Sequence, residues 1–294
     1  MRKPLVATAT ALAVVATGIA VAGVSLTARP ASAALSDVPA DCTVFTAAYR
    51  ADGQRLTYLY SDRKATTKAF VDDTLDWVPS ALQNMGGAGG DDEFRSREYV
   101  AHPTNGWLYK VVRWAKLVDG TWRITSKTVT QHTNGFAGTR ILAYAYPYLY
   151  RVAGNSLYRY TISSTGELTA RVKLPGTAWD TVNTLTFQRN GGSSATVDVL
   201  IGTKANGELK EWRINKATPT QISSKVLKPS GWAAINTLST GPCSAHPNGR
   251  ALVGITKTGK VSVHFDAKAT DGLGTDIKGG SLGEIDWTAK SYGQ

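Results

Sequence analysis

The sequence predicts an all-β protein built from five copies of one unit of about fifty residues. Each copy has an apolar strand, a turn with Gly or Asn, and a second strand that opens with Leu or Val. The opening residues are Leu56, Leu108, Leu157, Leu209 and Val261, so the copies are spaced by 52, 49, 52 and 52 positions. Between these landmarks apolar and polar residues alternate with period two, and no stretch after residue 33 carries a capped helical stripe.

A second landmark follows later in each unit, where an aromatic residue precedes a pair of apolar residues. These aromatic residues are Trp77, Phe136, Trp179, Trp232 and Trp287. A period near fifty with about four short strands is typical of a β-propeller blade, and five copies account for residues 34–294. A β-helix would need shorter repeats, and a single sandwich would not produce five evenly spaced copies. We therefore predict a five-bladed β-propeller.

A propeller must close its ring, because open first and last blades would expose strand edges. The last segment, Ile285–Tyr292, has no following unit, and we expect it to pair with the first blade around Val44–Tyr49. Cys42 and Cys243 occupy nearly equivalent places in the first and fifth units, which adjoin only in a closed ring. The sequence therefore predicts closure by terminal strand pairing and by a Cys42–Cys243 disulfide.

The N-terminus has the pattern of a secretory signal peptide. Arg2 and Lys3 precede an apolar run over 5–26, and Ala31-Ser32-Ala33 offers the small residues that a signal peptidase recognises. An uncleaved membrane anchor is the alternative, since the run is long enough to span a bilayer. The cleavage pattern and the lack of a later apolar stretch of similar length favour removal of residues 1–33. We expect a secreted domain, residues 34–294, that is not embedded in a membrane.

Charge and composition exclude several classes of function. Residues 34–294 contain 30 basic and 22 acidic side chains, a net charge of +8, without a run of five or six Lys or Arg. A dedicated nucleic-acid-binding protein would concentrate that charge. Two cysteines and four scattered histidines have no metal-ligand spacing, and no phosphate-binding or nucleophile-elbow motif is present. We expect a monomer without metal or other cofactor.

Several short motifs resemble those of the tachylectin-like five-bladed β-propellers. The matching pieces are Gly106-Trp-Leu-Tyr109, Asn155-Ser-Leu-Tyr158, Gly207-Glu-Leu209 and Gly231-Trp232, spread over most of residues 34–294. Phe136 replaces the Trp landmark in the second unit, and insertions at 85–92 and 188–195 interrupt the pattern. The resemblance implies a lectin that binds N-acetylated sugars or cell-wall glycans in one small pocket per unit.

The tryptophan landmarks are the first candidates for a binding site. Sugar rings present C–H faces that stack on indole, while nearby amides and carboxylates bind the hydroxyl groups. The candidate ligand-binding residues are Trp77, Trp179, Asp180, Asn183, Gly231, Trp232, Asn236 and Trp287. The alternative is that these tryptophans pack between blades and the asparagines bond to backbone in turns.

Two other functions compete with carbohydrate binding. Unequal inserted loops would suit a scaffold for an extracellular protein partner, and five-bladed propellers also house glycoside hydrolases. Hydrolysis needs two carboxylates at a fixed separation. We expect the innermost strands at 100–101, 149–152, 200–204 and 252–257, which contain no Asp or Glu, and we expect Asp72, Asp73 and Asp76 in solvated loops, like the acidic run 91–93. The sequence therefore favours a binding protein over an enzyme.

Overall fold

The computed structural model describes residues 34–287 and 289–293. The predicted signal peptide, residues 1–33, lies outside the described residues. Twenty β-strands and three short 3₁₀ turns, η1 (Leu35–Asp37), η2 (Trp179–Thr181) and η3 (Ser193–Ala195), make up the regular structure of the described part. The all-β prediction is confirmed, because no α-helix occurs in these ranges.

Three four-stranded antiparallel sheets form from consecutive strands. The first contains β8 (Thr139–Ala145), β9 (Tyr148–Ala153), β10 (Ser156–Ile162) and β11 (Leu168–Lys173). The second contains β12 (Thr186–Gly191), β13 (Val197–Thr203), β14 (Leu209–Asn215) and β15 (Ile222–Lys228). The third contains β16 (Ile235–Gly241), β17 (Arg250–Thr256), β18 (Lys260–Asp266) and β19 (Ile277–Glu284). Each is the up-and-down sheet of a β-propeller blade.

The remaining eight strands form one sheet with two halves. The β4–β7 half contains β4 (Ala81–Gly89), β5 (Glu93–Ala101), β6 (Trp107–Val118) and β7 (Thr121–Asn134). The β20–β3 half contains β20 (Ala289–Tyr292), β1 (Thr43–Arg50), β2 (Gln54–Ser61) and β3 (Lys64–Thr74), in that order. A single parallel bridge between Val71 and Arg123 joins the halves, and all other pairings within them are antiparallel.

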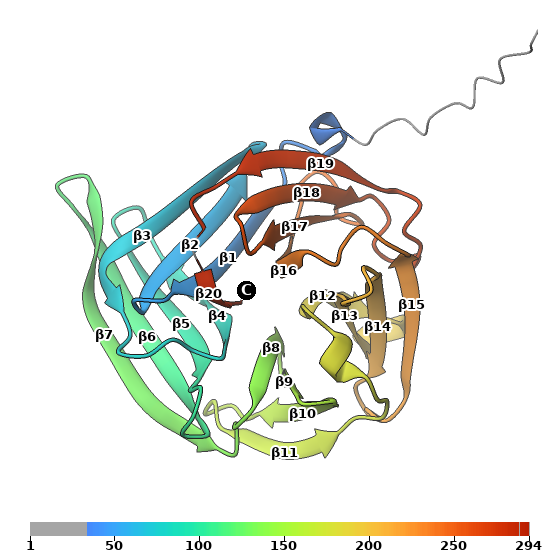
Figure 1. Cartoon of the computed structure of the whole chain (residues 1–294), viewed down its shortest axis with the longest axis horizontal. Helices are drawn as coiled ribbons and strands as arrows, with labels where there is room; N and C mark the ends of the chain where they lie inside the picture. The colour runs from blue at the N-terminus through green and yellow to red at the C-terminus, as the bar shows by residue number, and fades with distance from the viewer. Residues whose placement is uncertain (1–33, 288, 294) are drawn as a thin grey trace, which may run out of the picture. The chain divides into compact units, whose positions relative to one another are not determined.

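The sheets are arranged around a common centre, and one edge strand of each sheet or half-sheet lies innermost (Figure 1). β4, β8, β12, β16 and β20 hold these inner positions, and β5, β9, β13 and β17 lie second in their sheets. Our assignment of the innermost strands to 100–101, 149–152, 200–204 and 252–257 was therefore wrong. Those segments are apolar because the side chains on both faces of β9, β13 and β17 are buried.

The first and last strands of the described chain lie side by side in one sheet. β20 pairs antiparallel with β1, with Tyr292 opposite Ala48 and Ser291 opposite Tyr49. The predicted disulfide between Cys42 and Cys243 is confirmed, and it joins positions 201 residues apart. One core cluster contains residues of both the β20–β3 half and the β16–β19 sheet, among them Val44 and Ile255, together with Trp287 from the connection between β19 and β20.

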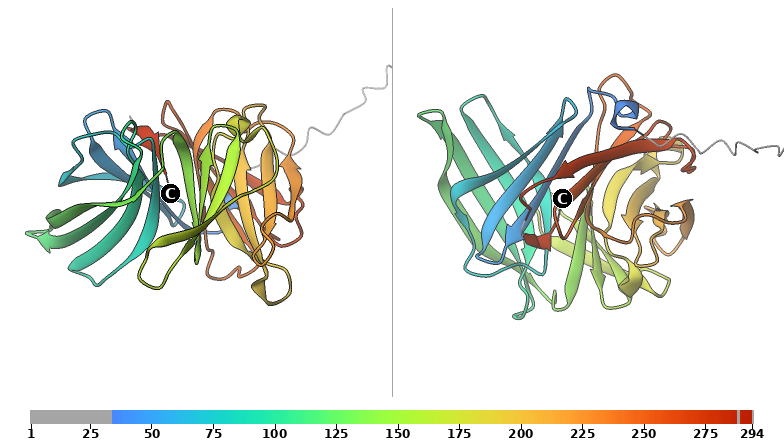
Figure 2. Two further views of the ribbon diagram at one scale, coloured as in Figure 1. Left: turned by 90° about the horizontal axis from the view of Figure 1, so that it is seen from below. Right: turned by 45° about the horizontal axis from the view of Figure 1, so that its top comes forward.

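The β3 strand and the β6–β7 hairpin are longer than strands of the other sheets. β3, β6 and β7 contain 11, 12 and 14 residues, whereas the strands of the three separate sheets contain six to eight. The long hairpin projects beyond the neighbouring strands (Figure 2). This extension has no counterpart in the fifty-residue repeat.

A buried ion-pair cluster lies where the two halves of the eight-stranded sheet meet. Arg55 donates to Glu98 at 3.1 Å, and Arg113 pairs with both Glu98 and Asp73. The hydroxyl of Tyr49 donates to Glu98 at 2.7 Å. Although burial alone would favour the neutral acid, the two guanidinium groups lower the pKa of Glu98. The expectation of a solvated Asp73 was wrong: it is 1% exposed, because strand pairing brings two arginines from distant segments to it.

Candidate functional site

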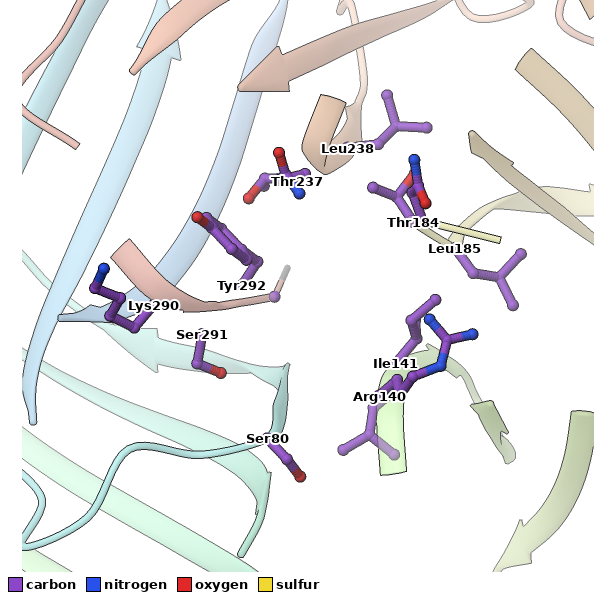
Figure 3. A pocket seen from close by; sticks show the side chains of 14 residues that line it. Ser80, Arg140, Ile141, Thr184, Leu185, Thr237, Leu238, Lys290, Ser291 and Tyr292 are labelled. Atoms are coloured by element: carbon purple, nitrogen blue, oxygen red, sulfur yellow. The ribbon is translucent and has the colours of Figure 1, made fainter. Parts of the chain in front are cut away.

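The innermost strands surround a small polar cavity at the centre of the sheets. Its volume is about 110 Å³. All five inner strands, or the short segments that lead into them, contribute polar side chains to the lining, among them Ser80, Arg140, Asn183, Asn236 and Ser291. Figure 3 shows Ser80, Arg140 and Ser291 around a shared space, together with Thr184 and Thr237. The repeat therefore builds a ring of polar side chains, which we call the central ring.

Local irregularities in the strands place these side chains. The register of β8 shifts at Arg140, between Thr139 and Ile141, and that of β16 shifts at Asn236, between Ile235 and Thr237. The backbone N–H groups of Asn183 and Thr184 both donate to the carbonyl of Thr203, so two residues oppose one. A bulge of this kind turns a side chain out of the regular alternation. Here the irregularities accompany the polar residues Arg140, Asn183 and Asn236, all of which line the cavity.

Several polar groups of the lining have unused hydrogen-bonding capacity. The hydroxyls of Thr237 and Ser291 are buried and have no hydrogen-bond partner in the described part of the chain. Asn183 donates its amide to the carbonyl of Ala233 at 3.2 Å, which leaves its side-chain carbonyl as an acceptor. Arg140 donates to the carbonyl oxygens of Trp179 and Val182, at 2.8 and 3.3 Å, which fixes its position.

The charges around the cavity are positive. Arg140 and Lys290 belong to the lining, and no Asp or Glu does. Tyr292 donates its hydroxyl to the carbonyl of Ala289 at 3.0 Å, and burial raises the pKa of this tyrosine, so it is neutral at physiological pH. The cavity thus presents hydroxyls, amides and two cations, a set that suits a ligand rich in hydroxyl, carbonyl or anionic oxygen.

A second cavity of about 290 Å³ contains Trp179. It lies between the β11–β12 connection and the β14–β15 hairpin, and its walls include Trp212, Lys210 and Ser224. The two indole rings are 5.4 Å apart, and the ammonium of Lys210 is 5.8 Å from the Trp212 ring. Trp179 is only 4% exposed, and its N–H has no hydrogen-bond partner within the described ranges. A ligand in this cavity would therefore meet the edges of the indole rings and the ammonium of Lys210, and not an exposed indole face.

The other aromatic landmarks lie in the core between sheets. Trp232 and Trp287 are 6% and 2% exposed. Trp232 lies 4.7 Å from the ring of His264, and burial lowers the pKa of that histidine to about 4. Trp287 meets Tyr58 edge to face at 6.3 Å. Trp77 is half-buried and packs on His102 and Tyr109. Each landmark thus packs against a ring from another strand, as in the alternative we weighed.

The predicted site residues therefore separate into groups. Asn183 and Asn236 join the central ring, and Trp179 lines the second cavity. Asp180 is exposed on η2, where its charge acts on Arg140. Gly231 has a φ of +97°, a conformation that favours glycine in the turn before Trp232.

Sequence reasoning missed Ser80, Arg140 and Ser291 as members of the central ring. A signal for two of them was present: Arg140 and Ser291 each follow an aromatic landmark by four positions, as Asn183 and Asn236 do. Ser80 follows Trp77 by three. The spacing was hidden because the five ring residues differ in type.

No group of three or more His, Cys, Asp or Glu side chains is placed to hold a metal ion in residues 34–287 and 289–293. In the same ranges, no helix has the length and apolar character needed to cross a bilayer.

Comparisons with known proteins find resemblance at the level of structure alone. No protein-family profile and no curated protein sequence matches the chain. Similar solved structures include the BP39L lectin of Burkholderia pseudomallei, 9% identical with a TM-score of 0.42 over 84% of this chain and 81% of that chain. The Mala s 1 allergen of Malassezia sympodialis is 9% identical, with a TM-score of 0.41 over 84% of this chain and 90% of that chain. A luciferin-regenerating enzyme is 10% identical, with a TM-score of 0.39 over 89% and 99%. Because these scores are below 0.5, function has to be argued from this chain's own residues.

Proposed function

We propose that this protein is a secreted, five-bladed β-propeller that binds carbohydrate, with N-acetylated sugars or cell-wall glycans as its ligands. The observation that carries the proposal is the central ring, in which polar side chains from five equivalent positions converge on one cavity. Sugars are recognised by such sets of amides and hydroxyls, each of which can donate and accept.

The size of the cavity favours a substituted sugar. At about 110 Å³ it is smaller than the ~300 Å³ at which pockets for drug-sized ligands begin. It therefore admits one substituent, such as an acetamido group, while the sugar ring lies over the rim. The acetamido oxygen would accept a hydrogen bond from Asn236, and its N–H would donate to the free hydroxyl of Thr237 or Ser291.

The fold and the location in this proposal have their own supports. The two halves of the eight-stranded sheet meet at a single bridge, so we count them as two blades beside the three separate sheets. Pairing of β20 with β1 and the Cys42–Cys243 disulfide would close the ring. A disulfide is typical of oxidising compartments, which agrees with the export pattern of residues 1–33. Mature residues 34–294 would form one monomeric domain of the tachylectin-like type.

A binding assay with paired variants tests the function and its site together. The purified, oxidised protein is applied to a glycan array and to insoluble chitin and peptidoglycan. We expect Asn183→Ala with Asn236→Ala to weaken binding by about five- to 150-fold, since each lost hydrogen bond costs about 0.5–1.5 kcal/mol. Asn155→Ala, at an exposed turn outside the cavity, is the matched control.

Trp179→Leu separates the second cavity from the central ring. If this variant alone loses binding, the ligand lies in the second cavity near Trp212, in agreement with the prediction that Trp179 contacts the sugar. If no glycan binds at millimolar concentration, the carbohydrate proposal is wrong, and an extracellular protein partner becomes the leading alternative.

A further inference from the structure

An apolar pocket lies between the two halves of the eight-stranded sheet, away from the central ring. Its volume is about 330 Å³. Five apolar side chains from β1, β2, β3, β5 and β7 form most of its wall: Phe45, Leu59, Phe70, Phe94 and Trp122. The long β3 and β7 strands supply Phe70 and Trp122, so the pocket belongs to the part of the fold that departs from the repeat.

The aromatic wall is continuous but leaves apolar surface uncovered. The rings of Phe70 and Phe94 are 5.8 Å apart, and those of Phe94 and Trp122 are 5.2 Å apart. On the opposite side, Phe45 and Leu59 remain 40% and 41% exposed. Exposed apolar surface costs roughly 25 cal/mol per Å² relative to burial. A ligand with an apolar body would recover part of that free energy.

The pocket also has polar side chains in its lining, which could bind a polar group at one end of such a ligand. Ser96 is 8% exposed, lines the pocket, and its hydroxyl has no hydrogen-bond partner in the described ranges. Arg55 also lines the pocket, with its Nε held by Glu98. Lys68 is exposed at the wall and makes no ion pair among the described residues.

The charges leave one cation without a counterion. The two arginines of the buried cluster, Arg55 and Arg113, are balanced by Asp73 and Glu98. Lys68 therefore adds a net charge of about +1 to the pocket, in a position where an apolar ligand would displace water from it. Electrostatic complementarity then favours a ligand with a single negative group.

We propose that this pocket binds a small amphipathic monoanion: an aliphatic or aromatic body that ends in one carboxylate or sulfonate. The volume falls in the range of about 300–1,000 Å³ typical of sites for compact organic ligands. The body contacts the aromatic wall, and the anionic group lies between Lys68 and the hydroxyl of Ser96. This activity is separate from glycan binding and uses no residue of the central ring.

Two probes test the proposal with the folded, oxidised protein. Anilinonaphthalene sulfonate reports binding by its fluorescence, and decanoate competes for the same pocket. Thr66→Trp places an indole at the pocket wall from an exposed position of β3, and we expect it to weaken binding of both probes at least tenfold. Thr128→Trp, an equally exposed position of β7 outside the lining, is the control and binds as the wild type does.

A charge variant tests the choice of an anion. Lys68→Gln should weaken decanoate about two- to fivefold, as expected for a partly exposed ion pair, and leave decanol unchanged. Equal losses for decanoate and decanol would refute the role of Lys68. If Thr66→Trp binds both probes as tightly as the wild type, the proposed site is wrong. The proposal is also overturned if the wild-type protein is a dimer that Thr66→Trp dissociates, because a second copy would then cover the pocket. Glycan binding of the same variants is measured separately, so failure here is distinguishable from failure of the proposed function.

Discussion

A buried carboxylate at the end of β18 makes the stability of this protein depend on pH. Asp266 is 2% exposed, and one of its oxygens has no partner in the described part of the chain. The other accepts a long hydrogen bond from the side-chain amide of Gln188, at 3.4 Å. Burial, reinforced by the nearby carboxylates of Asp276, Asp271 and Glu211, raises the pKa of Asp266 to about 7.

The direction and the size of the change in unfolding free energy with pH follow from the pKa of Asp266 in the folded and the unfolded state. The pKa is about 7 in the folded state and 3.8 at its ordinary value, so the folded protein binds this proton more tightly than the unfolded chain. The free energy of unfolding then falls as pH rises from about 4 to 7 and stays low above that. At 1.36 kcal/mol per pKa unit, ionisation of Asp266 removes about 4 kcal/mol across this interval.

Asp266→Asn removes the ionisation and serves as the test. We expect the difference in unfolding free energy, variant minus wild type, to move by about 4 kcal/mol in favour of the variant between pH 4 and pH 8. Urea titrations at several pH values, followed by tryptophan fluorescence and circular dichroism, measure it. Asp91→Asn, at an exposed position, is the control and should show little change. A difference for Asp266→Asn that stays constant with pH would refute the reasoning.

Three further variants probe the features that hold the sheets together. Glu98→Gln leaves two buried arginines short of a partner and should destabilise the protein by about 3–5 kcal/mol, measured by the same urea titration; a loss under about 1 kcal/mol would contradict the buried ion-pair cluster. Replacing Cys42 and Cys243 by Ser should cost up to about 5 kcal/mol, the chain-entropy value for a loop of this length, and non-reducing titrations that match the wild type would contradict it. Gly202→Ala should lower the midpoint of unfolding, because a Cβ would lie 2.0 Å from the carbonyl oxygen of Thr184; an unchanged midpoint would show that the inner strand yields there.

Much of the fold was accessible from the sequence because it depends on local pattern. Period-two alternation marks strands, and turns with Gly or Asn separate them, so the repeat was visible through Leu157, Leu209 and Val261 without knowledge of contacts. The disulfide was also predictable, since Cys42 and Cys243 hold equivalent places in the repeat. The order of strands within a sheet was not, because the pattern shows how apolar a strand is but not which edge faces the centre.

The sequence predicted only part of the candidate site. Asn183 and Asn236 were chosen for their nearness in sequence to Trp179 and Trp232, yet the bulges turn the asparagines toward the centre while the indoles remain in the core between sheets. Trp179 and Trp232 lie in the connections before β12 and β16, where the backbone changes direction before the asparagines, so proximity along the chain does not place two side chains in one site.

The amino-acid sequence by itself determined the all-β class and the fifty-residue unit through its periodicity, and the pairing of the two cysteines through their equivalent places in the first and fifth units. Only the tertiary structure decided which polar residues form the central ring, that Asp73 is buried beside Arg113, and that β3 and β7 diverge around an apolar pocket. These features join residues from separate strands, and their geometry depends on register, bulges and strand length, which the pattern of a single segment does not specify.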